Sequence, residues 1–167
     1  PKIYEQVVFK NLNKIYKISR YPVSKNNSLK PWSAADEHSL EYLKSKNLVD
    51  KNIIIYNDRF AFLTCILNQY TPLTVISYKS QEKACLKNLD ANRLSILDSQ
   101  FINPLSTINK PIDFGIIKIP KSLELFRLFL YQISQNTNEH TQVICSFMTR
   151  HFSSQQLKIA SEFYNTT

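Results

Sequence analysis

From residue 53 onward, short apolar runs alternate with longer amphipathic stretches, and this alternation restricts the possible folds more than any other feature. The apolar runs, which are typical of buried strands, occupy residues 52–56, 73–77, 93–97, 114–119 and 141–147. The amphipathic stretches predict helices near residues 60–69, 79–90, 122–135 and 153–164. Buried strands joined by helical crossovers indicate a parallel sheet with helices on both faces. We therefore predict an α/β, Rossmann-like fold.

The first part of the chain has a different pattern. Residues 4–10 and 14–21 alternate as two strands joined at Asn11–Asn13, which predicts an antiparallel β-ribbon. A helix should begin after Ser33, because Asp36 follows three residues later as in a capping box. We expect residues 1–30 to be the ribbon and a loop, and residues 31–167 to be the main domain, both in one structural unit.

Positive charge is concentrated in the ribbon. Residues 1–30 hold seven of the basic residues and one acidic residue, and so account for six of the eight excess positive charges. The candidates for RNA contact in this segment are Lys10, Lys14, Lys17, Arg20, Lys25 and Lys30. Aromatic residues lie between them (Tyr4, Phe9, Tyr16 and Tyr21), a composition that suits phosphate contact and base stacking. The alternative is that the lysines only keep the edge of a ribbon from aggregating.

Several other classes of protein are disfavoured. No apolar run approaches the ~18 residues of a membrane span, and no signal peptide opens the chain, so we expect a cytoplasmic protein without a membrane partner. Cys65, Cys85 and Cys145 are widely spaced within apolar patterns, which predicts buried free thiols. The three histidines lie far apart in the sequence and lack metal-ligand spacing.

Specific motifs add a family resemblance. The block Trp32–Glu37 (WSAADE), the segment Ile53–Cys65 (IIIYNDRFAFLTC) and the block Ile119–Leu123 (IPKSL) occur in the order and setting of one family. With them, the chain resembles the N-terminal half of the RlmG and RsmC type of ribosomal RNA guanine-N2 methyltransferases, with RlmG, the large-subunit enzyme, the nearer match.

The resemblance implies a class I methyltransferase fold in two tandem copies. The C-terminal copy of such enzymes binds S-adenosylmethionine and carries out the reaction, whereas the N-terminal copy helps to hold RNA and supports its partner. This chain is thus expected to be a non-catalytic domain whose partners are protein-free ribosomal RNA and a C-terminal catalytic domain. The closing strand pair of the fold is missing after residue 164, so we expect a truncated domain.

The positions that bind the cofactor in active relatives are degenerate here. The strand-end acid falls at Ile55, and the three glycines of the following turn fall at Asn57, Arg59 and Ala61. The acid that would bind the ribose hydroxyls falls at Ser77 or Tyr78. We therefore expect no cofactor in this domain. Asp98, after the third predicted strand, remains a polar residue that more often caps a turn.

The reaction motif of active relatives, Asn-Pro-Pro-Phe, is degenerate as well. Its Asn becomes Lys118, its first Pro becomes Ile119 and its aromatic residue becomes Lys121. An ammonium group only donates hydrogen bonds, so Lys118 cannot accept one from a guanine amine. Lys118 and Lys121 could contact a phosphate or be solvated. Two other functions stay open: an active stand-alone methyltransferase with a remodelled turn, and a scaffold that never contacts RNA.

Overall fold

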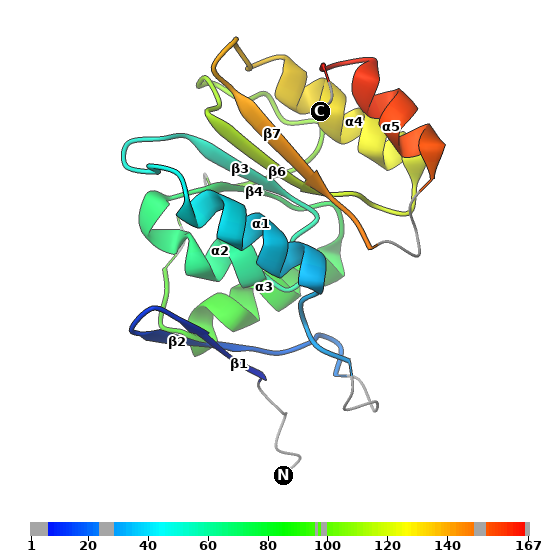
Figure 1. Ribbon diagram of the computed structural model, residues 1–167. Helices are drawn as coiled ribbons and strands as arrows, with labels where there is room; N and C mark the ends of the chain where they lie inside the picture. Colours follow the sequence, from blue (N-terminus) through cyan, green and yellow to red (C-terminus); the bar gives the residue numbers. More distant parts are fainter. Residues whose placement is uncertain (1–6, 24–28, 96, 98–99, 149–152, 166–167) are drawn as a thin grey trace.

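A five-stranded parallel sheet forms the centre of the molecule (Figure 1). The computed structural model describes residues 7–23, 29–95, 97, 100–148 and 153–165. The sheet has the strand order β5-β4-β3-β6-β7. Its strands are β3 (Ile53–Tyr56), β4 (Leu73–Val75), β5 (Phe101–Ile102), β6 (Phe114–Lys118) and β7 (Gln142–Ser146). All four neighbouring pairs are parallel, which confirms the predicted α/β architecture.

Helices cover both faces of this sheet, as predicted (Figure 1). One face carries α1 (Ala34–Lys44), α2 (Phe62–Ile66) and α3 (Lys79–Ala91), and the other carries α4 (Leu123–Ser134) and α5 (Ser154–Ser161). The central strand β3 supplies both cores, because its successive side chains point to opposite faces. Ile53 and Ile55 join the core under α1–α3, whereas Ile54 and Tyr56 join the core under α4 and α5.

The core under α4 shows how the sequence stabilises this arrangement. Phe126, Phe129, Leu130 and Ile133 recur at helical spacing and are fully buried against the sheet. Each such side chain contributes about 1.5–3 kcal/mol when it is removed from water. This apolar stripe is therefore the main attachment of α4 to the sheet.

The N-terminal ribbon is confirmed as an antiparallel hairpin. It consists of β1 (Val7–Asn11) and β2 (Lys14–Ile18), with Phe9 opposite Tyr16; residues 4–6 of the predicted strand lie outside the described part of the chain. Phe9 and Tyr16 pack into the body of the protein, where Phe9 meets the rings of Trp32 and Phe62 edge-on. Neither ring is therefore free to stack on a base.

Two asparagines, Asn88 of α3 and Asn92 at its C-cap, fix the hairpin to the domain. The Lys17 N–H donates to Asn92 Oδ1 (2.7 Å), and Asn92 Nδ2 donates to Lys17 O (2.8 Å). Four residues earlier on the same helix face, Asn88 forms the equivalent pair of bonds with the backbone of Ser19 (3.0 and 2.9 Å). The two amides thus satisfy the outer edge of β2 as a further strand would, and they hold the hairpin in one orientation.

The start of α1 follows the predicted capping box. Asp36 N donates to Ser33 Oγ, and Ser33 N donates to Asp36 Oδ2. The Trp32 ring stacks on Phe62 at 5.0 Å between centroids, and its Nε1 donates to Glu37 Oε1 (2.9 Å). Trp32 therefore packs the start of the helix against β1 and α2.

The strand predicted at residues 93–97 is wrong. The corresponding strand is β5, which begins at Phe101, and residues 93–95 are a turn and irregular backbone. Arg93 has a φ of 55°, its N–H donates to Asp90 O, and the Leu94 N–H reaches back to Leu89 O. This is the Schellman ending of α3, in which an apolar residue just beyond the helix packs back on it. Leu94 thus belongs to a helix cap that resembles a strand in the sequence.

Two smaller predictions need adjustment. The helix expected near residues 60–69 is the short helix α2, which ends at Ile66, followed by the 3-10 turn Asn68–Tyr70. This turn ends where Thr71 takes a left-handed backbone conformation. The three cysteines are all free, but only Cys65 and Cys85 are fully buried, whereas Cys145 is partly exposed. Burial raises the pKa of each of the three thiols, so they stay protonated and unreactive.

Candidate functional site

The candidate site lies at the carboxyl ends of β3 and β4, where ligands bind in parallel α/β sheets. The position of the expected strand-end acid, Ile55, lies within β3 between Thr74 and Ile116 of its neighbours and is fully buried. An aliphatic side chain in this position accepts no hydrogen bond. The first polar contact expected of a cofactor site is therefore missing.

The loop after β3 keeps the backbone of a glycine-rich turn without its glycines. Asn57 and Ala61, which occupy the first and third glycine positions, both have a φ of 61°. This left-handed region favours glycine and is tolerated by asparagine, whereas it costs alanine roughly 1–2 kcal/mol. Asn57 Nδ2 donates to Lys118 O (2.9 Å), so the turn is tied to the end of β6. The loop thus has left-handed backbone at two of the glycine positions, and the side chains of Asn57 and Arg59 line the cleft beside it.

The space left at this loop is small. Tyr21, Asn57, Arg59, Tyr78, Ser80 and Gln81 enclose a cleft of about 50 Å³. Pockets for ligands of the size of S-adenosylmethionine measure about 300–1,000 Å³. Ser77 and Tyr78 occupy the position of the ribose-binding acid and carry no carboxylate. The residues present do not fit the cofactor, and Asp98 lies outside the described residues.

Asp58 is a structural residue of this loop that sequence reasoning missed. Its carboxylate is buried and accepts hydrogen bonds from Thr64 N (2.8 Å), Thr64 Oγ1 (2.7 Å) and Leu63 N (3.3 Å), so it caps the start of α2. Burial raises the pKa of Asp58 to about 6, although the hydrogen bonds from Thr64 and Leu63 oppose the shift. An Asp in the turn just before an apolar helix was the available signal, since such residues favour caps.

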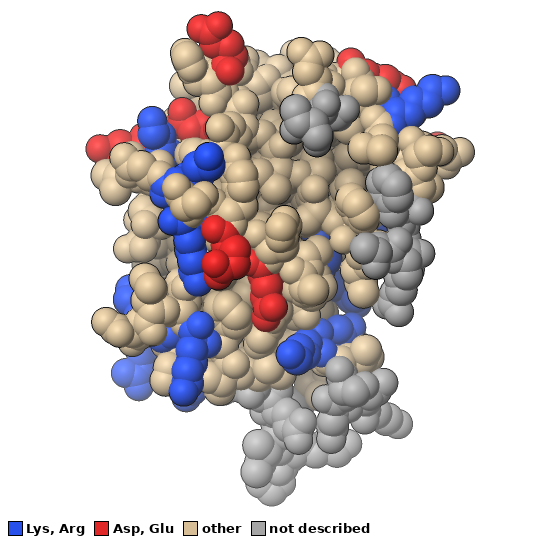
Figure 2. Space-filling view, viewed as in Figure 1, with Lys and Arg blue, Asp and Glu red and all other residues tan. Residues whose placement is uncertain are grey.

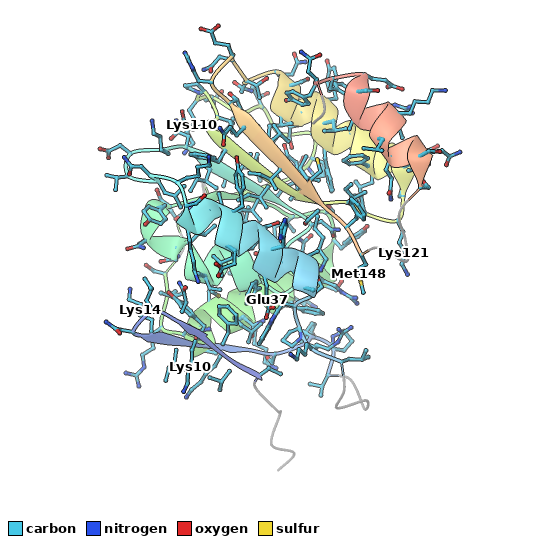
Figure 3. The ribbon with its side chains drawn as sticks, viewed as in Figure 1. Lys10, Lys14, Glu37, Lys110, Lys121 and Met148 are labelled. Carbon is cyan, nitrogen blue, oxygen red and sulfur yellow. The ribbon has the colours of Figure 1, made fainter. Side chains whose placement is uncertain are left out.

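The degenerate reaction motif follows β6. Lys118 Nζ lies 3.0 Å from Asp36 Oδ2, an ion pair that neither of the two expectations for this lysine included. Ile119 N donates to Ser146 O (2.8 Å) and so continues the pairing of β6 with β7. Lys121 is exposed at the same end of the sheet as Met148, away from Lys10 and Lys14 (Figure 3). The segment is thus held by structural contacts, and only Lys121 extends freely into solvent.

The hairpin presents a mixed basic and apolar surface. Val8 and Lys10 of β1 lie opposite Lys17 and Ile15 of β2, and all four side chains are exposed. Val8 and Ile15 keep 49% and 59% of their surface in water, so this face of the hairpin is partly apolar.

Basic side chains gather over the hairpin, whereas acidic side chains gather over α1 on the same face of the molecule (Figure 2).

The remaining candidates fall into two groups. Arg20 and Lys30 follow the hairpin; Arg20 Nη1 donates to Lys30 O (3.1 Å), and Lys30 Nζ lies 6.0 Å from the centroid of Trp32. Lys25 lies outside the described residues.

Among the helices that the structure describes, none is long and apolar enough to span a bilayer. The same part of the chain holds no group of three His, Cys, Asp or Glu side chains placed to bind a metal ion.

Comparison with known proteins links this geometry to a family. The family model described as "RLMG N-terminal domain" matches residues 6–167. A "Ribosomal RNA large subunit methyltransferase G" from Shewanella sediminis is 34% identical over 131 residues, which cover 76% of this chain and 32% of the relative. The protein of the same name from Colwellia psychrerythraea is 33% identical over 161 residues, which cover 90% of this chain and 40% of the relative. The chain thus spans about a third to two-fifths of the length of these relatives.

Solved structures confirm the fold class. A putative SAM-dependent methyltransferase from Streptococcus mutans superposes with a TM-score of 0.66 at 14% identity, covering 95% of this chain and 46% of that one. The T. thermophilus 16S rRNA N2 G1207 methyltransferase (RsmC), solved with AdoMet and guanosine, gives a TM-score of 0.64 at 14% identity, covering 87% of this chain and 42% of that one. At these identities the likeness shows a class I methyltransferase fold and nothing further.

Proposed function

Because this chain belongs to the RLMG N-terminal domain family, we propose that it is a non-catalytic domain of an S-adenosylmethionine-dependent 23S-type rRNA (guanine-N2) methyltransferase. Its task is to bind protein-free ribosomal RNA in the cytoplasm and to support a C-terminal catalytic domain. The cofactor acts in that second domain and not in this one. Residues 1–30 and 31–167 work as one unit, since Asn88 and Asn92 tie the hairpin to α3.

The observation that carries the proposal is the basic face of an anchored hairpin. Lys10, Lys14 and Lys17 are exposed, and none of them forms an ion pair with a described residue. Because the backbone of Lys17 is bonded to α3, binding RNA here orders little of the chain. Cations on a rigid surface neutralise phosphates at a low entropic cost.

The degenerate loop supports the non-catalytic part of the proposal. An isoleucine stands at the acid position, the cleft measures about 50 Å³, and Lys118 is engaged with Asp36. Lys118, which stands at the position of the lost Asn, only donates hydrogen bonds and cannot accept one from a guanine amine. The fold is therefore reused as a platform.

The test replaces Lys10, Lys14 and Lys17 together by glutamine. Binding of a fluorescently labelled, protein-free fragment of 23S rRNA is followed by anisotropy at several salt concentrations. We expect weaker binding to all sequences, and a log–log salt slope that falls by about 2.1–2.7, because each of the three lost phosphate contacts removes about 0.7–0.9.

A matched control keeps the same change of charge. The control variant also removes three positive charges, by replacing Lys51, Lys110 and Lys158 with glutamine. Lys110 lies far from Lys10 and Lys14 (Figure 3). Lys158 belongs to α5, which covers the other face of the sheet from α1–α3. This variant should bind the rRNA fragment with nearly the affinity of the unmodified chain, apart from a small loss caused by its lower net positive charge. Equal effects of the two triple variants would show that the hairpin is only a solubility device and would favour the scaffold function.

A further inference from the structure

Two arginines from different parts of the chain converge on one aromatic ring beside the closed loop. The guanidinium carbons of Arg20, which follows β2, and of Arg59, which follows β3, each lie 5.0 Å from the centroid of Phe60. Each contact has the geometry of a cation–π interaction, which is worth about 0.5–1 kcal/mol at an exposed site. Phe60 therefore holds the two cations close together.

The two charges have no counter-ion among the described residues. Neither Arg20 nor Arg59 forms an ion pair with a described acidic group. Both lie within 5.0 Å of one point, so their separation does not exceed a Debye length of about 10 Å at 0.1 M salt, and they repel each other. Consistent with this, burial and the neighbouring charge of Arg59 lower the pKa of Arg20. A bound anion would relieve the repulsion.

The geometry next to Arg59 suits a phosphate group. The cleft of about 50 Å³ has room for a few water molecules, each of which needs about 10–15 Å³ of such space. Phosphate oxygens, which are similar in size to a water molecule, can therefore enter it. Tyr78, at the rim, leaves 56% of its surface exposed, so its ring can stack on a neighbouring base.

We propose that Arg20 and Arg59 together bind one phosphodiester group of a single-stranded RNA segment. The loop that excludes the cofactor is then itself an RNA contact, which extends the basic face of the hairpin from Lys17 past Arg20. A guanidinium offers several N–H donors in a planar fork that matches two phosphate oxygens, so two arginines are better suited to this contact than two lysines. This inference rests on the proposed function, because it assumes that the chain binds RNA.

The first test is Arg59→Gln, measured with a short, labelled single-stranded RNA of mixed sequence. We expect about fivefold weaker binding at 0.1 M salt, and a salt slope reduced by about 0.7 for one lost contact on a single strand. Arg59→Lys should keep the slope but recover only part of the affinity, because it keeps the charge and loses the fork. Lys51→Gln is the control. Lys51 lies before β3, at the opposite end of the strand from Arg59, and its replacement changes the net charge by the same amount.

A double-mutant cycle with Arg20→Gln tests whether the two arginines share one phosphate. If they do, the combined variant loses less affinity than the two single losses together predict. Independent, multiplicative losses would overturn the shared site. The thermal unfolding of each variant by circular dichroism shows that the fold is kept.

Two further experiments distinguish an RNA phosphodiester from a free phosphate ion as the ligand. An RNA in which methylphosphonates replace the phosphodiesters should bind equally to the unmodified chain and to Arg59→Gln. Calorimetry with inorganic phosphate alone identifies a site for a free anion; saturable phosphate binding that depends on Arg59, without any effect of Arg59 on RNA, would overturn the proposal.

The outcomes separate this inference from the proposed function. If the hairpin triple variant weakens RNA binding while Arg59→Gln behaves like Lys51→Gln, the arginine site is wrong and the proposed function stands. If neither variant differs from its control, both are wrong.

Discussion

Lys118 Nζ lies 3.0 Å from Asp36 Oδ2, and this ion pair joins the end of β6 to the first turn of α1. The same oxygen accepts the N–H of Ser33 at 2.7 Å, so the lysine also supports the capping box. Asp36 is almost fully buried (6% of its side chain is exposed), whereas Lys118 keeps 28%. The family resemblance places the Asn of the reaction motif at position 118. Lys118 at that position joins β6 to α1 through this ion pair.

Replacing Lys118 by methionine should destabilise the protein by about 1–3 kcal/mol, because it leaves the carboxylate of Asp36 buried without its counter-charge. The partial exposure of Lys118 keeps the loss below that of a fully buried pair. Urea unfolding at pH 7 measures the effect. Lys121→Met is the matched control: this exposed lysine has no described ion-pair partner, so its loss should change the unfolding free energy by less than about 0.5 kcal/mol. Similar values for both variants would contradict a structural role of the ion pair.

The titration of Asp58 should lower the free energy of unfolding as the pH rises. A salt-bridged carboxylate has the opposite effect. Burial raises its pKa in the folded protein from 3.8 to about 6, so between these values the folded state binds more protons than the unfolded state. The contribution of Asp58 to stability is therefore full below pH 4 and falls as the pH rises through 6, by up to about 3 kcal/mol.

The comparison of the unmodified chain with Asp58→Asn isolates this effect. The unfolding free energy of the unmodified chain relative to the variant should decrease from pH 4 to pH 7, and then level off. Asp50→Asn, which removes an exposed carboxylate, serves as the control. If the curves for the unmodified chain and Asp58→Asn run parallel over this range, Asp58 titrates normally.

Restoring the glycines should not restore cofactor binding. The triple variant Asn57→Gly, Arg59→Gly and Ala61→Gly removes the side chains from the loop, but Ile55 still offers no acceptor and no carboxylate stands at Ser77 or Tyr78. Calorimetry with S-adenosylmethionine should therefore show no saturable heat, with the T. thermophilus enzyme that was solved with AdoMet as the positive control. A one-to-one titration of the triple variant would show that the side chains alone close the site. Binding by the unmodified chain would instead support an active stand-alone methyltransferase.

The parts of the fold that depend on local sequence were predictable. The helices, the hairpin and all strands of the sheet except β5 follow from apolar periodicity, and the capping box at Ser33 follows from the spacing of Asp36. The contacts that define the site were not, because they join residues far apart in sequence: Lys118 with Asp36, Asn88 with Ser19, and Arg20 with Arg59 through Phe60. Their chemistry was visible in the sequence, but their pairing is set by the tertiary fold.

Gly115, the one glycine of the chain, is required by packing and not by backbone conformation. An ideal Cβ on Gly115 in β6 would overlap Cδ1 of Ile133, a fully buried residue of α4. Gly115→Ala should therefore cost about 1–3 kcal/mol through overpacking. Ile133→Val removes the overlapping methyl group and alone costs about 0.5–1.5 kcal/mol.

The double variant should be more stable than the two separate losses predict, because the new methyl group fills the space that the old one leaves. Urea unfolding of the four proteins closes the cycle. Additive losses would mean that β6 and α4 move apart instead. Because β6 carries Lys118, the ion pair between Lys118 and Asp36 would then weaken together with the core.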